Sequence, residues 1–130
     1  MAEETSNRSE VDQFILDQID SVPHLEALLL LWNQRPKNWS VDEMAKALFV
    51  SPGSAREILQ NLTRRRLIAP DPSAADAYFY EASPEKDRLI GMVNATYKRE
   101  LIRLSNLIHS KPSAAIREFA KAFRFKKEGD

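Results

Sequence analysis

The stretch that decides the fold is residues 40–70, SVDEMAKALFVSPGSAREILQNLTRRRLIAP. Ser40 is a residue type that caps helices, and two carboxylates follow it where the positive end of a helix dipole favours negative charge. Ser51 and Pro52 form a second start signal, because proline suits the first helical position. The stretch therefore predicts a short helix, a tight turn, a second helix and the beginning of a strand.

Apolar residues in this stretch recur at the spacing of helices with one buried face. The predicted buried residues are Met44, Ala45, Leu48 and Phe49 in the first helix and Ala55, Ile58, Leu59 and Leu62 in the second. Val50 is expected to plug the turn between the two helices. Leu67 and Ile68 begin a strand that Pro70 ends. The other side chains of the second helix are polar, so they are predicted to face water or a partner.

Two helices are predicted before this stretch. Apolar residues between Val11 and Ile19 recur at helical spacing, which indicates a short amphipathic helix. Ser21 and Pro23 open another helix that ends before Pro36. Almost all late positions of this second helix are apolar, so we expect it to be the central helix of the core.

A hairpin and two further helices are predicted after it. A loop of turn-forming residues separates the first strand from AYFYEA, which is rich in strand-forming residues. Ser83 and Pro84 open a long helix that is predicted to reach about His109, and a last helix follows from Ala114 to about Phe123. The predicted organisation is a disordered N-terminus at 1–10, a domain at 11–83, two appended helices at 84–123 and a basic tail at 124–130.

Composition narrows the class of protein. The 130 residues suit one domain with appended helices, and the chain has no cysteine, which excludes disulfides and thiolate metal sites and fits the cytoplasm. No apolar run approaches the length of a membrane span. His24 and His109 lie far apart in sequence without a carboxylate cluster, so no metal site is expected. Motifs for a phosphate loop or a catalytic nucleophile are missing, so neither an enzyme nor a cofactor is predicted.

Charge is unevenly distributed along a chain whose formal net charge is zero. Acidic side chains are in excess in residues 1–50, and basic side chains are in excess in residues 51–130. The basic excess begins with the second helix of the deciding stretch. A neutral chain has no overall attraction for nucleic acid, so any such binding needs a local basic patch.

The pattern S-P-x-S-A-R-x-I-L-x-x-L at 51–62, followed by R-R-R-L-I at 64–68 and a hairpin, resembles the winged helix-turn-helix domains of bacterial MarR-type and PadR-like transcription regulators. This resemblance implies a mainly α fold with a two-stranded wing and appended N- and C-terminal dimerisation helices. Phe49 and Arg66 depart from the family pattern, which often has glycine at both places. The segments L-I-H-S-K-P-S at 107–113 and F-A-K-A-F-R-F-K-K at 119–127 resemble a bacterial group of unassigned function.

The resemblance further implies a transcription regulator that binds double-stranded DNA through the second helix. In such domains the first turns of this helix enter the major groove, and its later basic residues meet phosphates. Carried onto this chain, the DNA-binding residues would be Lys46, Ser51, Gly53, Ser54, Arg56, Gln60, Arg64 and Arg65.

Other observations keep a second hypothesis open. The tip of the predicted wing carries Asp71 and Asp76, and carboxylates beside phosphates would weaken DNA binding. Arginines at a helix end also complement the helix dipole and can remain solvated. The alternative is therefore an adaptor that docks a protein partner and does not bind DNA.

The apolar stripe of the predicted long helix needs a covering surface. A homodimer would supply it, and the interface residues would be Ile90, Val93, Tyr97, Leu101, Leu104, Ile108 and Phe119. The alternative is that the stripe packs back on the chain's own N-terminal helices. Aromatic residues such as Trp32, Trp39 and Tyr80 could line an effector pocket, although such residues are more often core anchors.

Overall fold

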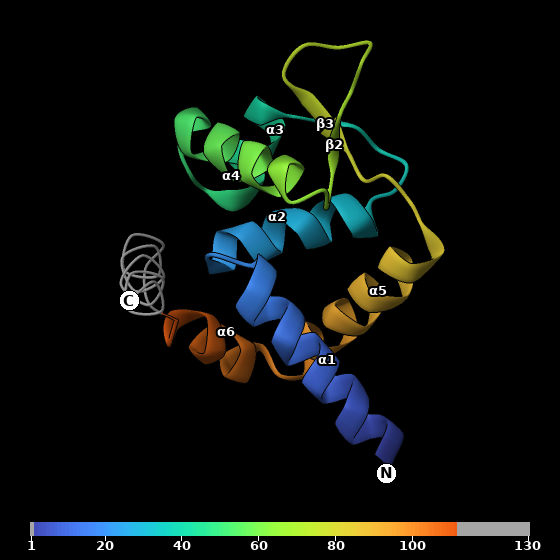
Figure 1. The fold of residues 1–130 in the computed structure, drawn as a ribbon. Helices are drawn as coiled ribbons and strands as arrows, with labels where there is room; N and C mark the ends of the chain where they lie inside the picture. Colours follow the sequence, from blue (N-terminus) through green and yellow to red (C-terminus); the bar gives the residue numbers. More distant parts are fainter. Residues whose placement is uncertain (1, 112–130) are drawn as a thin grey trace, which may run out of the picture.

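The computed structural model describes residues 2–111. The elements are α1 (Ala2–Gln18), α2 (Val22–Asn33), β1 (Trp39–Ser40), α3 (Val41–Leu48), α4 (Pro52–Arg64), β2 (Ala69–Pro70), β3 (Ala77–Phe79), α5 (Pro84–Arg99) and α6 (Leu101–His109). In Figure 1, α2 separates α3, α4 and the strands from α1, α5 and α6. The order confirms the predicted mainly α, winged helix-turn-helix class. None of these helices is long and apolar enough to cross a bilayer. The predicted helix at 114–123 and the basic tail lie outside the described residues.

The central helix of the core is α2, as its sequence predicts. Leu25, Leu28 and Leu31 have no exposed surface, and the helix contacts α3, α4 and α5. A helix that is apolar nearly all round is stable only when several neighbours cover it. This requirement fixes the place of α4 relative to the rest of the chain.

Serine caps begin the helices where the sequence predicts them. The Ser51 hydroxyl accepts the Ser54 amide at 3.1 Å, and Ser83 caps α5 with proline following it. Ser40 accepts the Glu43 amide at 3.1 Å, and the Glu43 carboxylate accepts the Ser40 amide at 3.0 Å. This reciprocal pair is a capping box, which satisfies two backbone donors that the helix itself leaves unbonded.

The predicted two-stranded wing is present as the antiparallel pair of β2 and β3, and β1 adds a third strand that we did not predict. The strand order is β1-β3-β2, and Trp39 of β1 lies opposite Tyr78 of β3. Pro70 of β2 lies opposite Tyr78 from the other side, at the edge of the sheet where a residue without an N–H is tolerated. With two residues, β1 is too short to show the alternation that predicts strands.

Phe49 is not on the buried face of α3, where its spacing predicts it to be. It ends the helix in the left-handed conformation, with φ 57° and ψ 45°, and its side chain is 95% exposed. The Val50 amide reaches back to the Ala45 carbonyl at 3.0 Å, which closes the end of α3. The left-handed backbone turns the ring away from the core, at a cost of about 1–2 kcal/mol for a residue with a side chain.

The predicted long helix is broken at Glu100, so it forms α5 and α6. Glu100 has φ −129° and ψ 47°, outside the helical region, and its carboxylate accepts Arg8 at 2.9 Å and Arg103 at 2.8 Å. Both segments contact α1, on the two sides seen in Figure 1. The break lets the apolar residues before and after it reach the same helix.

The helix α1 begins at Ala2, which differs from the predicted disorder of residues 1–10. Ion pairs with distant parts of the chain hold its middle. Glu10 accepts Arg88 of α5 at 2.6 Å, and Asp12 accepts Arg103 of α6 with both oxygens at 2.9 Å. These partners are about eighty or ninety positions away in sequence, so local composition does not reveal them.

The imidazole of His24 is half-buried in the first turn of α2. Its Nδ1 lies 2.6 Å from the Ser21 hydroxyl. Burial lowers the pKa of His24; Asp20 raises it, and Arg65 and Lys111 lower it further. The folded protein therefore favours the neutral ring more than the unfolded chain does, so its stability contribution is present above the unfolded pKa and is lost as the pH falls through the folded value.

We predict that the melting temperature falls between about pH 7.5 and about pH 5.5 and that His24→Gln flattens this dependence, because glutamine takes up no proton in that range. Thermal denaturation at a series of pH values measures it. His109→Gln is the control, since His109 is exposed. An unchanged pH dependence in His24→Gln would contradict the prediction.

Candidate nucleic-acid interface

The N-terminal end of α4 is open to water. Its first residues, Ser51, Gly53 and Ser54, are exposed, while Ile58 and Leu59 of the predicted stripe are buried against the core. The Ser51 hydroxyl accepts the Ser54 amide and donates to the Ser54 hydroxyl at 3.0 Å. Pro52 has no N–H and the Ala55 amide donates to the Ser51 carbonyl at 3.0 Å, so the Gly53 amide is the donor of this turn that adds to the positive end of the helix dipole, which suits an anion such as a phosphate.

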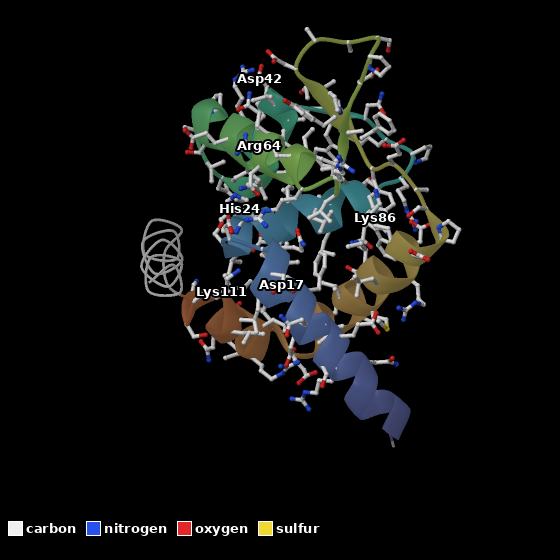
Figure 2. All side chains as sticks on the ribbon, in the orientation of Figure 1. Asp17, His24, Asp42, Arg64, Lys86 and Lys111 are labelled. Carbon is white, nitrogen blue, oxygen red and sulfur yellow. The ribbon has the colours of Figure 1, made fainter. Side chains whose placement is uncertain are left out.

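Two of the predicted cationic contacts are solvated. Lys46 of α3 and Arg64 of α4 are both exposed, and no carboxylate among the side chains described at 7–111 forms an ion pair with either. Arg64 lies on α4 near His24 of α2 in Figure 2. A shallow pocket on this face is lined by His24, Ser54, Glu57, Ile58, Gln60, Asn61 and Arg64. Arg64 and Gln60 are thus available to a ligand that lies along α4.

Arg56 is paired with the wing. Its Nη1 lies 2.5 Å from Asp76 Oδ1, and this hydrogen bond raises the pKa of the guanidinium. Asp76 has a left-handed backbone, with φ 56°, and its carbonyl accepts the Val41 amide at 3.0 Å. The ion pair therefore joins α4 to a fixed point of the wing. For Arg56 to contact a base, it has to leave Asp76 or bridge both groups.

The other acidic residue of the wing is also bonded within the domain. Asp71 accepts the Ser73 amide at 2.8 Å, the Ser73 hydroxyl at 2.7 Å and the Asn38 amide group at 2.5 Å. The Ser73 backbone bond is the main cause of its lowered pKa. Asp71 and Asp76, the two carboxylates expected to disfavour contact between the wing and DNA, thus both have partners. Of the two, Asp76 is paired with a positive charge, that of Arg56.

Arg65 is tied to the junction of α1 and α2. It donates to Asp20 Oδ1 at 3.0 Å, to the Asp17 carbonyl at 3.0 Å and to Asn61 Oδ1 at 3.2 Å. Asn61 in turn donates to Asp20 Oδ2 at 3.0 Å. The side chains of Arg65 and Asp20 are only 26% and 20% exposed. This network makes Arg65 a structural link between α4 and the N-terminal half of the chain, and its contact with DNA stays a prediction.

The predicted dimer residues separate into buried and exposed groups. Ile90, Val93, Leu104 and Ile108 are buried within one chain, so the alternative of packing on the chain's own helices accounts for these four. Tyr97 is half-buried, with its hydroxyl 3.3 Å from Glu26, and Phe119 lies outside the described residues.

An exposed apolar pair remains at the beginning of α6. Leu101 is 48% exposed and Ile102 is 71% exposed. Sequence reasoning missed Ile102 because it lies off the stripe that the seven-residue spacing defines. Ile102 could have been included in the predicted interface because it is apolar and adjacent to Leu101.

Cations lie on the aromatic rings that were candidates for lining an effector pocket. The Arg35 guanidinium lies 4.2 Å from the Trp32 ring centre and 5.7 Å from that of Tyr80, and Lys37 lies 4.8 Å from that of Trp39. These cations occupy the ring faces. Among the side chains described at 7–111, His, Asp and Glu form no group of three that could hold a metal ion.

The two neighbouring arginines at the end of α4 should differ in their effect on stability. We predict that Arg65→Ala lowers the free energy of unfolding by about 1–3 kcal/mol, because it removes an ion pair and two further hydrogen bonds within this network. Arg64→Ala is the matched control and should change it by less than about 0.5 kcal/mol. Denaturant titration measures both. Equal effects of the two substitutions would show that the Arg65 network does not stabilise the fold.

The fold of this chain is similar to that of solved structures of transcription regulators. No protein-family model matches the chain, and no curated protein matches it in sequence. Among solved structures, MepR of Staphylococcus aureus, a transcription regulator of the multidrug efflux pump MepA, is 17% identical, with 98% of this chain and 92% of that chain covered and a TM-score of 0.53. A MarR family protein of Bacillus stearothermophilus is 15% identical, with 98% and 87% covered and a TM-score of 0.51. A complex of S. aureus MepR with DNA is 15% identical, with 99% and 96% covered and a TM-score of 0.51. The chain has the winged-helix fold of these MarR-type regulators.

Proposed function

We propose that this protein is a cytoplasmic, dimeric winged-helix regulator of transcription that binds duplex DNA through α4. The observation that carries the proposal is the exposed, serine-capped N-terminus of α4 on a unit of three packed helices. Small polar residues there leave room for a close approach to base edges. The fold shared with MepR, of which a DNA complex is known, supports the same reading.

The proposed mode of binding follows from the geometry of α4. Its first turn would enter the major groove with Ser51, Gly53 and Ser54 next to the bases, and Gln60 would lie further along the groove. Lys46 and Arg64 would neutralise phosphates on either side. Because few cations on this face are unpaired, we expect modest non-specific affinity and a shallow fall of that affinity with salt, since the slope is proportional to the number of phosphates neutralised.

The ion pair between Arg56 and Asp76 gives Arg56 a specific role in this proposal. An arginine held in place by a carboxylate loses less freedom when it meets a guanine, but the same carboxylate repels phosphates. DNA therefore has to compete with Asp76 for Arg56. Removing the charge of Asp76 should favour binding.

A protein-docking adaptor is the second candidate. It is favoured by the pairing of Arg56 and Arg65 with acidic partners and by a net charge of zero. Retention on heparin distinguishes the two candidates, because a DNA-binding surface should hold the protein at moderate salt. Elution at very low salt, together with one stoichiometric protein partner from a lysate, would support the adaptor.

We predict opposite effects on DNA binding for two charge changes on this face. Arg64→Ala should weaken binding to all sequences alike and flatten the plot of log affinity against log salt by about one unit, whereas Asp76→Asn should strengthen binding. Fluorescence polarisation with random-sequence duplexes at several salt concentrations measures both effects.

Arg88→Ala on α5 is the control for this pair of variants, since Arg88 is also exposed but belongs to the other half of the molecule. If Arg64→Ala binds like the wild type at low salt, the assigned surface is wrong.

We further propose that the dimer interface includes Leu101 and Ile102, the exposed apolar pair of α6. We predict that the double variant Leu101→Ser, Ile102→Ser shifts the protein toward the monomer in sedimentation at micromolar concentration, because the interface loses its apolar contacts. Leu16→Ser on α1, also exposed, is the control. A dimer that persists in the double variant would place the interface elsewhere.

A dimer would present two copies of α4 to the same face of a duplex. Recognition helices in such dimers lie about 34 Å apart, one turn of DNA, so the site would be an inverted repeat. Selection of binding sites from a random library would reveal this symmetry.

A further inference from the structure

Phe49, in the turn between α3 and α4, combines two unfavourable features. Its backbone is left-handed, with φ 57°, a conformation that favours glycine. Its ring is 95% exposed, more than any other large apolar side chain among the described residues. Arg66 and Asp76 also have positive φ, but both are polar, and aspartate tolerates this conformation well. A glycine at this position would remove the backbone strain and the exposed ring together.

The direction of the ring is set by the backbone. The amides of Phe49 and Val50 bond to the carbonyls of Lys46 and Ala45, at 3.4 Å and 3.0 Å, so hydrogen bonds at the end of α3 hold the turn. Val50 packs against the core, which leaves Phe49 as the residue that the turn presents to water. The ring therefore lies in water, on a turn that is held by the hydrogen bonds at the end of α3 and by the packing of Val50.

The neighbours of Phe49 belong to the surface that we assign to DNA. Ser51, the cap of α4, is two residues away, so the two Cα atoms are separated by about 7 Å at most. Lys46, on the last turn of α3, is exposed and supplies positive charge beside it. An apolar ring between a lysine and the positive end of a helix fits an anionic partner that also offers apolar groups.

We propose that Phe49 is a DNA-contacting residue whose ring meets the C5-methyl group of a thymine in the major groove, beside the N-terminus of α4. This methyl group is the apolar feature of the major groove, and aromatic rings contact it. Contact with the methyl group would cover the ring that the free protein leaves in water. The inference rests on the proposed function and adds a preference for thymine at one position of each half-site.

The test compares the wild type with Phe49→Gly and Phe49→Leu. The probe is a duplex that the wild type selects from a random-sequence library, together with versions in which each thymine in turn is replaced by uracil, which lacks only the methyl group. Phe49→Gly should raise the melting temperature by about 2–4 °C, since glycine relieves the left-handed strain. It should also bind the selected duplex about tenfold more weakly, the loss expected for one base contact.

Replacement by uracil should identify the contacted base. At one position of each half-site, replacing thymine by uracil should weaken binding of the wild type about as much as the Phe49→Gly substitution weakens binding of the thymine duplex. The same uracil replacement should not weaken binding of Phe49→Gly any further. Phe49→Leu keeps an apolar side chain and the strained backbone, so it should retain most of the affinity, the sensitivity to uracil and the melting temperature of the wild type.

Each other outcome overturns the inference in a recognisable way. If Phe49→Gly is more stable but binds DNA like the wild type, the contact is wrong and the proposed function stands. If uracil has no effect at any position, the methyl group is not the contact. A change in the sedimentation of Phe49→Gly without DNA would mean that the ring covers a second copy of the chain. If the wild type selects no duplex, the proposed function fails together with this inference.

Discussion

The arrangement of this protein depends on the burial of α2. Leu25, Leu28 and Leu31 have no exposed surface, and no single neighbour could cover a helix that is apolar on nearly every side. The helices α3 and α4 cover one side, and α5 reaches it from the other. Because α4 is placed by its contact with α2, the outward direction of its polar face follows from the core. The candidate interface is thus a consequence of packing.

Ion pairs within the chain reduce the positive charge that this interface can present to a ligand. Arg56 is held by the wing and Arg65 by the junction of α1 and α2, so Lys46 and Arg64 supply the unpaired positive charge. A chain with zero net charge that also neutralises part of its own basic face relies less on long-range attraction. Close fit and short-range contacts at the start of α4 therefore carry more of the proposed recognition than charge does.

Local signals in the sequence predicted the starts of α2, α3, α4 and α5, because a capping serine acts on its own turn, with proline or carboxylates following it. The interruption at Glu100 was not predictable in this way, since it is held by Arg8 of α1 and by Arg103. Phe49 follows the helical spacing in sequence, but the left-handed turn removes it from the face that the spacing defines. The surface of α4 could be assigned from residue types, whereas the pairing of Arg65 with Asp20 depends on contacts across 45 positions.

Arg35 connects three elements of the fold, in addition to covering aromatic rings. It stacks on Trp32 of α2 and lies 3.8 Å from Asp87 of α5, which accepts the hydroxyl of Tyr80 at the root of the wing at 2.5 Å. One cation and one carboxylate thereby fasten together the central helix, the wing and the helix that leads to α6. A shift of α5 would break these contacts or move the wing with it. A structural change in the C-terminal half could therefore be transmitted to the wing beside α4 through these few side chains.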